Sequence, residues 1–473
     1  MSQVLALSLV LLASPPGEAV ASAPVLVNQD GGNQPQQEPS LALDPKDPAR
    51  VFVAFKDWRS GRKRVACARS EDGGRTWSDG LLGFGPNDYR EQSDPWLAVD
   101  RRGNVFLGAL FYRNPIAAGS GIFVARSSDG GRTFASPVAV AEAQGGDQED
   151  KDAIVVDDTG GLGDGRLYVA WAHLEDSNRD GAPDRSHIRL SCSRDQGASF
   201  GPAVTVSDGE RNHGPVPLVR ADGTLAVVWV MDIRAGATRL LADLSGDGGA
   251  TFGTDAVVAE VVAPGIYSQE SGFRELRPGL RVTPLPAAAV DRSDGPFRGS
   301  VYVAWTDGRT EDADILLACS RDGRRFSPPV RVNGDAPRNG RDQFFPVVAV
   351  DGSGRVHVAF MDRRDDPENL RMHLYHAVSL DGGASFRVEE RVTTTPSDPR
   401  TDFNGRLIGD YIGMGAVGER VLAAWCDTTG GNQDVRVTAL SVAGPAALLP
   451  AAAAPPAAPR PGEPAPPRPS TTR

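Results

Sequence analysis

The sequence has little of what marks several other classes of protein. Its 473 residues include four cysteines and 7% aromatic residues, and few segments show the apolar spacing of a helix. The apolar run at residues 4–13 is too short to span a bilayer. A net charge of −11 argues against nucleic acid and anionic membranes as partners. The chain has 54 glycines and 40% hydrophobic residues, which suits a large core of short strands and tight turns.

A short sequence motif occurs six times along the chain. One copy reads Ser127-Ser-Asp129-Gly-Gly131-Arg-Thr133-Phe134. The six copies are centred on Asp72, Asp129, Asp195, Asp247, Asp322 and Asp381, and the Asp322 copy is one residue shorter. Each lies between two strand-like runs, which predicts a hairpin turn whose aspartate accepts backbone N–H groups and whose glycines take positive φ. Repetition of this kind predicts an array of similar supersecondary units.

This motif resembles the Asp box, or BNR repeat, of sialidases and related β-propellers. The resemblance covers residues 24–442. We interpret the boxes as turn-stabilising devices without a catalytic role. A second repeat is a strand that ends in an aromatic residue, such as Leu167–Trp171 and Val301–Trp305. It occurs seven times, which indicates seven units. Each unit is expected to contain four antiparallel strands, and this predicts an all-β, seven-bladed β-propeller of antiparallel blades. Six blades are the alternative, because well-studied sialidase domains have six.

The two ends of the chain differ from the repeats. Residues 1–23 resemble a secretory signal peptide with a cleavage site at Ala21 or Ala23, although basic residues are absent from its start. A buried strand is the alternative. We therefore expect a secreted, cell-surface or periplasmic protein. Residues 443–473 are rich in Ala and Pro, which predicts a disordered tail or an extended spacer.

The seventh unit lacks a fourth strand. The segment Pro24–Asn28 closely matches Pro329–Asn333, which is the fourth strand of another unit. We predict that this N-terminal strand closes the last blade and removes the open edge of the ring. The cysteines fall on different units, too far apart to bridge, so we expect free thiols at Cys67, Cys192, Cys319 and Cys426.

Strand order predicts which face carries a site. In a four-stranded meander, the Asp boxes lie on one face, and the turns between second and third strands lie on the other. At the start of the first strands, neighbouring units 7, 1 and 2 hold Asp410, Glu38 and Asp94, with Tyr411 adjacent. We predict an acidic arc at the mouth of the central channel, where clustered carboxylates can share a proton or a cation. The alternative is that these strand ends are polar only because they lie in a solvent-filled channel.

Other candidates lie on the same face. Arg59 and Arg309 each follow an Asp by two residues, so they could grip an anionic ligand together with Arg406. Repetition favours the alternative, in which each Arg braces its own hairpin. The long connection before the fifth unit, residues 267–277, is either a functional rim or an ordinary insertion.

One turn resembles the first half of a calcium loop. Its oxygen ligands would be Asp176, Asn178, Asp180 and Asp184. His187 stands where a bidentate Glu is expected, so an acidic solvated turn is the alternative. We predict that no cofactor is required and that calcium is the candidate metal.

The resemblance implies exo-α-sialidase chemistry, with three arginines on the substrate carboxylate, a Tyr nucleophile and an acid/base carboxyl. Tyr411 would be the nucleophile and Glu38 or Asp94 the acid/base, with Arg59, Arg309 and Arg406 as the anion clamp. The Phe-Arg-Ile-Pro-like motif of sialidases is absent, and Gln34–Pro39 occupies its region. We therefore predict an exported monomer that binds a glycan or similar polar ligand. The alternatives are an active sialidase and a non-catalytic scaffold for a protein partner.

Overall fold

The computed structural model describes residues 19–83, 89–113, 119–176, 183–233 and 235–442. Within these ranges the regular structure consists of antiparallel strands and one 3-10 turn, η2 (Phe403–Gly405). No helix of the described part is long and apolar enough to cross a membrane. Most of the predicted leader, residues 1–18, and the predicted tail, residues 443–473, lie outside the described residues.

The first four sheets follow one another along the chain. Sheet 1 contains β3 (Gln36–Leu43), β4 (Val51–Asp57), β5 (Arg64–Ser70) and β6 (Ser78–Leu81). Sheet 2 contains β7 (Glu91–Val99), β8 (Val105–Tyr112), β9 (Ser120–Ser127) and β10 (Val138–Glu142). Sheet 3 contains β11 (Gln148–Val156), β12 (Leu167–Glu175), β13 (Arg185–Ser193) and β14 (Val204–Thr205). Sheet 4 contains β15 (Asn212–Val219), β16 (Leu225–Met231), β17 (Ala237–Ser245) and β18 (Ala256–Val262).

A small sheet then interrupts the series. It contains β19 (Ile266–Tyr267), β20 (Arg274–Leu276) and β21 (Leu280–Arg281). Sheet 5 contains β22 (Ala287–Val290), β23 (Val301–Asp307), β24 (Asp314–Ser320) and β25 (Val330–Arg331). Sheet 6 contains β26 (Gln343–Val350), β27 (Val356–Asp362), β28 (His373–Ser379) and β29 (Val388–Arg391). Sheet 7 contains β30 (Gly413–Val417), β31 (Arg420–Asp427) and β32 (Asp434–Val442), and both β1 (Ala19–Ala21) and β2 (Val25–Leu26) pair with β32.

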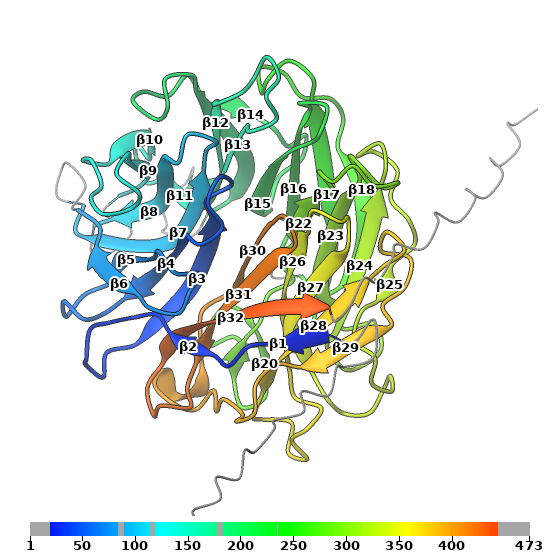
Figure 1. The fold of residues 1–473 in the computed structure, drawn as a ribbon. Coiled ribbons are helices and arrows are strands. Elements are labelled where there is room, and N and C mark those ends of the chain that lie inside the picture. Colours follow the sequence, from blue (N-terminus) through cyan, green and yellow to red (C-terminus); the bar gives the residue numbers. More distant parts are fainter. Residues whose placement is uncertain (1–18, 84–88, 114–118, 177–182, 234, 443–473) are drawn as a thin grey trace, which may run out of the picture.

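The first strands of these sheets touch one another in a closed cycle. The order of contact is β3, β7, β11, β15, β22, β26, β30 and again β3. Figure 1 shows the sheets side by side around the molecule, with β1 and β2 alongside β32. Antiparallel sheets arranged around a common centre are typical of a propeller.

The second strands of the seven large sheets are among the most buried elements of the molecule. Strands β4, β8, β23 and β27 are buried along their whole length. Their Val- and Ala-rich sequences suit this position because both faces of the strand meet a neighbouring sheet. The closing aromatic residues are almost wholly inaccessible, as the 0–1% exposure of Trp171, Trp229, Trp305 and Trp425 shows. The core is therefore distributed between sheets and does not form one central cluster.

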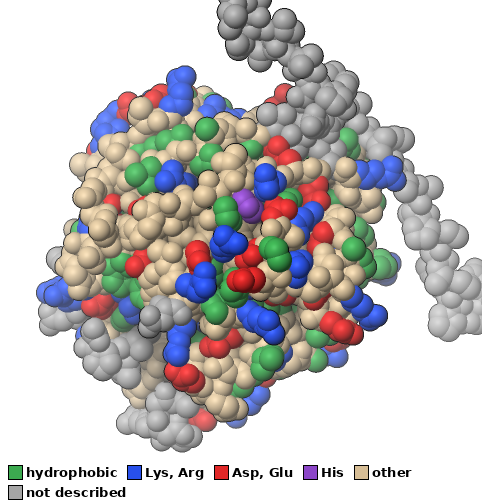
Figure 2. All heavy atoms as spheres, turned by 90° about the horizontal axis from the view of Figure 1, so that it is seen from below, with side chains coloured by type: hydrophobic (Ala, Val, Ile, Leu, Met, Phe, Trp, Pro, Cys, Tyr) green, Lys and Arg blue, Asp and Glu red, His purple; other side chains and the backbone are tan. Residues whose placement is uncertain are grey.

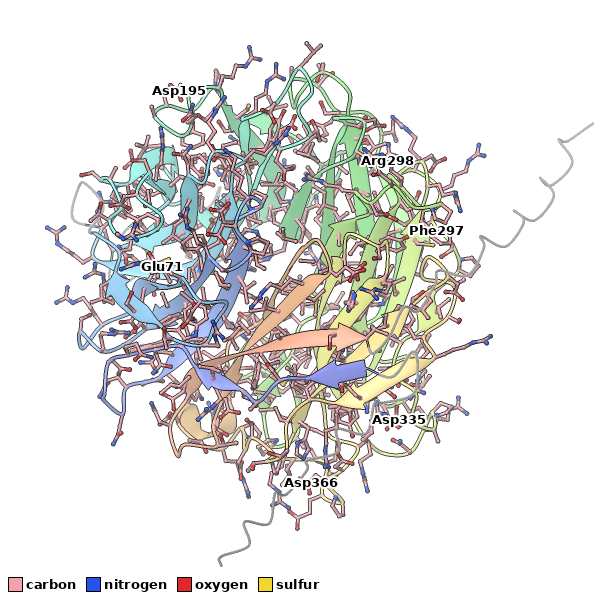
Figure 3. All side chains as sticks on the ribbon, viewed as in Figure 1. Glu71, Asp195, Phe297, Arg298, Asp335 and Asp366 are labelled. Carbon is pink, nitrogen blue, oxygen red and sulfur yellow. The ribbon has the colours of Figure 1, made fainter. Side chains whose placement is uncertain are left out.

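The repeated motif forms the turn after the third strand in sheets 1 to 6. In sheet 2, Ser127 Oγ donates to Asp129 Oδ1 (2.7 Å) and accepts the N–H of Gly131 (2.9 Å). Asp129 also accepts from the backbone N–H (3.0 Å) and the hydroxyl (2.6 Å) of Thr133. These hydrogen bonds, with that of the Thr133 hydroxyl foremost, lower the pKa of Asp129. Asp195, labelled in Figure 3, makes the equivalent bonds after β13.

The predicted glycine conformations and cysteine states agree with the structure. Gly130 and Gly131 have φ of +72° and +74°. All four cysteines are free, and Cys67 and Cys426 are buried. The predicted pairing of the N-terminal segment is also present, with Val25 opposite Val437 and Leu26 opposite Arg436.

Candidate functional site

Five of the seven first strands share an unusual backbone feature at the predicted positions. Strands β3, β7, β11, β15 and β26 each have a register shift, and a residue inside each shift has positive φ. These residues are Glu38 (55°), Asp94 (50°), Lys151 (50°), Gly214 (60°) and Phe345 (52°). Positive φ is costly for residues other than glycine, and such strain is found at functional sites. A β-bulge also re-aims a side chain, and here the bulges line the openings at the centre of the molecule.

A cavity of about 960 Å³ lies above these bulges. Its walls come from turns between second and third strands, including Trp58 and Lys63, and from connections between sheets, including Arg211 and Phe403. This is the face predicted from the strand order, since the Asp boxes occupy the opposite turns. Glu38, Asp94 and Asp410 all line the cavity, so the fold brings the predicted acidic arc together.

Each carboxylate of the arc faces one cation. Lys56 Nζ donates to Glu38 Oε1 at 2.6 Å, and both side chains are nearly inaccessible. The Ser93 hydroxyl donates to the other oxygen of Glu38 at 3.4 Å. Arg281, from β21, forms a two-point ion pair with Asp410 in which Nε lies 2.8 Å from Oδ1. The first pair joins neighbouring strands of one sheet, β3 and β4, whereas the second joins segments that are far apart in the sequence. Both pairs fix the carboxylates in place.

Asp94 has the weakest charge compensation of the three. Its nearest cation is Lys151, whose Nζ lies 3.8 Å from Asp94 Oδ1. Burial, followed by the negative charge of Glu38, raises the pKa of Asp94 to about 7, and Lys151 opposes this rise. At neutral pH a substantial fraction of Asp94 therefore carries a proton, next to a carboxylate that is ion-paired to Lys56.

Tyr411 follows Asp410 in the chain but lies outside the cavity that the carboxylates line. Its ring is 3.8 Å from Lys151 Nζ and 6.0 Å from the ring of Trp96, and its hydroxyl donates to the carbonyl of Pro95 at 3.3 Å. Tyr411 lines a smaller opening of about 250 Å³ and not the large cavity. Burial and the charges of Glu38 and Asp94 raise the pKa of Tyr411 well above its usual value. These features are the opposite of what an activated tyrosine nucleophile requires.

The three arginines predicted as an anion clamp do not line the cavity. Arg59 binds Asp57 (2.7 Å) and Asp79, and Arg309 binds Asp307 (2.8 Å). Both therefore brace their own hairpins, as the repetition indicated. Arg406 is 55% exposed and pairs with Glu270 at 2.8 Å. The clamp prediction is wrong because intramolecular carboxylates already occupy these guanidinium groups.

Other arginines do line the cavity, and they are spread around it. Arg211 is 69% exposed and pairs with Asp232 at 3.0 Å. Arg185 is 55% exposed and pairs with Glu210 at 3.3 Å. Arg281 is engaged by Asp410 on another wall. Acidic and basic side chains are also interspersed on the face drawn in Figure 2. A three-arginine site for one carboxylate is therefore not assembled among the described residues.

The predicted calcium loop is only partly described. Asn178 and Asp180 lie outside the described residues, while Asp176 and Asp184 flank the gap. The backbone N–H of Asp176 donates to Asp147 Oδ1 at 3.1 Å. Among the described residues, no group of three or more His, Cys, Asp or Glu side chains is arranged to hold a metal. Calcium at this loop stays a prediction.

The chain has structural neighbours among proteins of known structure. No protein-family model matches it, and no curated protein matches it. Among solved structures, a protein of unknown function from Dyadobacter fermentans is 13% identical, covering 90% of this chain and 99% of that chain, with a TM-score of 0.47. The Hadza microbial sialidase Hz136 is 14% identical, covering 86% and 75%, with a TM-score of 0.46. The Penicillium chrysogenum α-L-arabinanase complexed with arabinobiose is 13% identical, covering 89% and 98%, with a TM-score of 0.49. At these values the likeness does not assign an activity.

Proposed function

We propose that this protein is a seven-bladed propeller that binds glycans in its large cavity and hydrolyses a glycosidic bond there. Seven blades are supported by the closed cycle of first strands, from β3 round to β30. Closure of the last blade by the N-terminal strand is supported by the pairing of β2 with β32. The small sheet β19–β21 is then an insertion before the fifth blade.

The carboxyl pair Asp94 and Glu38 carries the proposal. Glycoside hydrolases commonly use two carboxyl groups whose environments differ, one protonated and one charged. Asp94 has a pKa raised to about 7, whereas Glu38 forms a 2.6 Å ion pair with Lys56. Both side chains line the same cavity and come from neighbouring strands, β3 and β7.

The two carboxyl groups would have separate roles. Protonated Asp94 would donate its proton to the oxygen of the leaving sugar, so that the bond to the anomeric carbon breaks. The carboxylate of Glu38 would remove a proton from the attacking water or would itself attack the anomeric carbon. The Lys56 ammonium and the Ser93 hydroxyl would hold Glu38 in position.

A panel of aryl glycosides and unactivated oligosaccharides tests this assignment. It should include α-L-arabinofuranosides, β-galactosides, β-glucuronides and α-sialosides. For the substrate that is cleaved, we expect Glu38→Gln to lower kcat on the order of 100- to 10,000-fold with either kind of leaving group. Asp94→Asn should cause a comparable loss only with unactivated sugars, because an aryl leaving group departs without a proton.

Matched variants make the test decisive. Asp47→Asn changes a half-exposed carboxylate outside the cavity and should leave turnover unchanged. Tyr411→Phe should retain most activity. If a sialoside is cleaved and Tyr411→Phe abolishes that cleavage, the sialidase chemistry holds and the two-carboxyl assignment is wrong. Glycan binding without turnover of any substrate would reduce the protein to a binding module.

A further inference from the structure

Two aromatic side chains meet at the rim of the cavity. Trp58 belongs to the turn between β4 and β5, and Phe403 begins η2 in the connection between sheets 6 and 7. Their ring centroids are 5.4 Å apart with an interplanar angle of 59°. Both line the cavity, and Phe403 is 38% exposed although it is a large apolar residue. The proposed catalytic carboxyls make no use of this pair.

The backbone under Phe403 is strained and firmly held. Asp402 and Phe403 have φ of +57° and +41°, which disfavours any residue other than glycine. The buried Gln433 holds this loop at three points: its N–H donates to Asp402 Oδ2 (3.0 Å), and its side-chain amide donates to the carbonyls of Thr401 (3.0 Å) and Leu407 (2.9 Å). These hydrogen bonds hold the strained backbone in place, and the strained conformation exposes an apolar ring. Strain of this kind is found at functional sites, which indicates a function for the Phe403 ring.

The small sheet buttresses the loop from its other side. The Arg281 N–H donates to the Arg406 carbonyl at 3.0 Å, and Arg406 pairs with Glu270 at 2.8 Å. Gly405, with φ of +80°, packs against the ring of Pro278 so closely that an added Cβ would lie 3.1 Å from its Cγ. The loop and the insertion therefore form one continuous wall of the cavity.

The aromatic pair lies close to the carboxyl groups. Lys56 Nζ is 2.6 Å from Glu38 Oε1 and 5.3 Å from the centre of the Trp58 ring. Glu38 Oε1 and the centre of the Trp58 ring are therefore no more than about 7.9 Å apart, which is close enough for neighbouring rings of one oligosaccharide to reach both. A sugar ring has an apolar C–H face and a rim of hydroxyls, so it matches an aromatic surface that is bordered by charged groups.

We propose that Trp58 and Phe403 form a stacking subsite for a second sugar ring, so that the substrate is an oligosaccharide and not a single terminal sugar on a small aglycone. This inference rests on the proposed function of the cavity. It concerns binding, so it can fail or hold independently of hydrolysis. Trp58 has a fixed position in this subsite because it lies on a hairpin, and Phe403 is supplied by the strained loop.

Binding measurements on the full chain test the subsite. In an Asp94→Asn background, which should slow the turnover of unactivated sugars, calorimetric titrations would use lactose, xylobiose and arabinobiose, each against its monosaccharides. We expect one disaccharide to bind about tenfold more tightly than its monosaccharides, which corresponds to about 1.4 kcal/mol. Phe403→Ala should remove about that tenfold gain and leave monosaccharide affinity unchanged.

Two controls exclude a trivial loss. Phe403→Tyr keeps the ring and should keep the disaccharide affinity. Leu162→Ala removes a fully exposed apolar side chain that does not line the cavity and should change nothing. The subsite is overturned if Phe403→Ala binds the disaccharide as the parent does, if it loses both sugars equally, or if no disaccharide of the panel binds more tightly than its monosaccharides.

Discussion

Asp94 and Lys151 illustrate how single residues tune the site. Both occupy strained bulges of neighbouring sheets, and Lys151 Nζ lies between the Asp94 carboxyl and the face of Tyr411. The ring attracts the ammonium group and helps to hold it beside Asp94. That charge limits how far burial raises the pKa of Asp94. In the proposed mechanism, Lys151 would therefore be a positioning residue that sets the pH range in which Asp94 can act as an acid.

We expect Lys151→Met to shift the alkaline limb of the pH–rate profile to higher pH. A general acid must be protonated, so the activity of the parent protein should fall as pH rises through about 7. Removing the Lys151 charge destabilises ionised Asp94 and raises its pKa further, so activity should persist to higher pH. The measurement is kcat/KM between pH 5 and 9, on the glycoside that the panel identifies.

The shift should not appear in a control on the opposite face. Arg75→Met removes an exposed charge from an Asp box and should leave the profile unchanged. An unchanged alkaline limb in Lys151→Met, or a shift toward lower pH, would show that Asp94 is not the acid. Thermal unfolding of both variants would establish that the comparison is made on folded protein.

The acidic arc could be predicted from the sequence, but its partners could not. The repeat fixes the offset between first and second strands, so Glu38, Asp94 and Asp410 fall at equivalent positions without any knowledge of contacts. Lys56 was visible as a charged residue near the end of a mostly apolar strand. Arg281 was not, because it lies 129 residues from Asp410 and only the folded insertion brings the two together. The arginines Arg59 and Arg309 were misassigned to a ligand because hairpin bracing and ligand binding have the same sequence signature.

At the level of single elements, the Asp-box turn is stabilised mainly by its first residue. Ser127 is 1% exposed, and its hydroxyl is both donor to Asp129 and acceptor for the Gly131 N–H. The same two bonds are present after β17, where Ser245 contacts Asp247 and Gly249. The aspartate bonds the exposed side of the turn, whereas the serine satisfies a buried N–H group that would otherwise have no partner.

We therefore expect Ser127→Ala to lower the free energy of unfolding by about 1–3 kcal/mol, the cost of an unsatisfied buried N–H group. Urea denaturation of the two proteins measures the difference. Thr133→Ser is the matched control: it keeps the hydroxyl that bonds Asp129, as Ser199 does for Asp195, and should change stability by roughly 0.5 kcal/mol or less. A loss in the control as large as in Ser127→Ala would contradict this division of roles.

Local elements were more predictable than inserted ones. The Asp-box turn and the strand that ends in an aromatic residue each depend on contacts within a few residues of the chain. Their sequence patterns were therefore enough to predict them. The segment from Ile266 to Arg281 was predicted only as a long connection, yet it forms the small sheet β19–β21. Its strands have two or three residues each and are stabilised by neighbours such as Arg406. No local periodicity can reveal strands that short.

For the whole molecule, the two ends of the described chain are held together by contacts along β32. Val27 is fully buried, and its N–H donates to the Val435 carbonyl at 2.8 Å. Asn28 adds two side-chain bonds, one to the Val435 N–H (2.9 Å) and one to Asp434 (3.0 Å). Strand β1 lies further along β32, with Ala19 opposite Val442. A leader removed at Ala21 or Ala23 would take β1 with it and leave β2 in place.

Two truncations separate these contributions. A chain that starts at Pro24 keeps β2, Val27 and Asn28, so we expect it to fold and to unfold within a few degrees of the full chain. A chain that starts at Gln29 leaves the edge of β32 unpaired and exposes the apolar side chains that Val27 covers. Such an edge pairs readily with other molecules, so this chain should aggregate or unfold at a markedly lower temperature. Thermal unfolding and size-exclusion chromatography measure both effects. Equal behaviour of the two truncations would mean that β2 does not close the ring, because every contact that distinguishes them lies between Pro24 and Asn28.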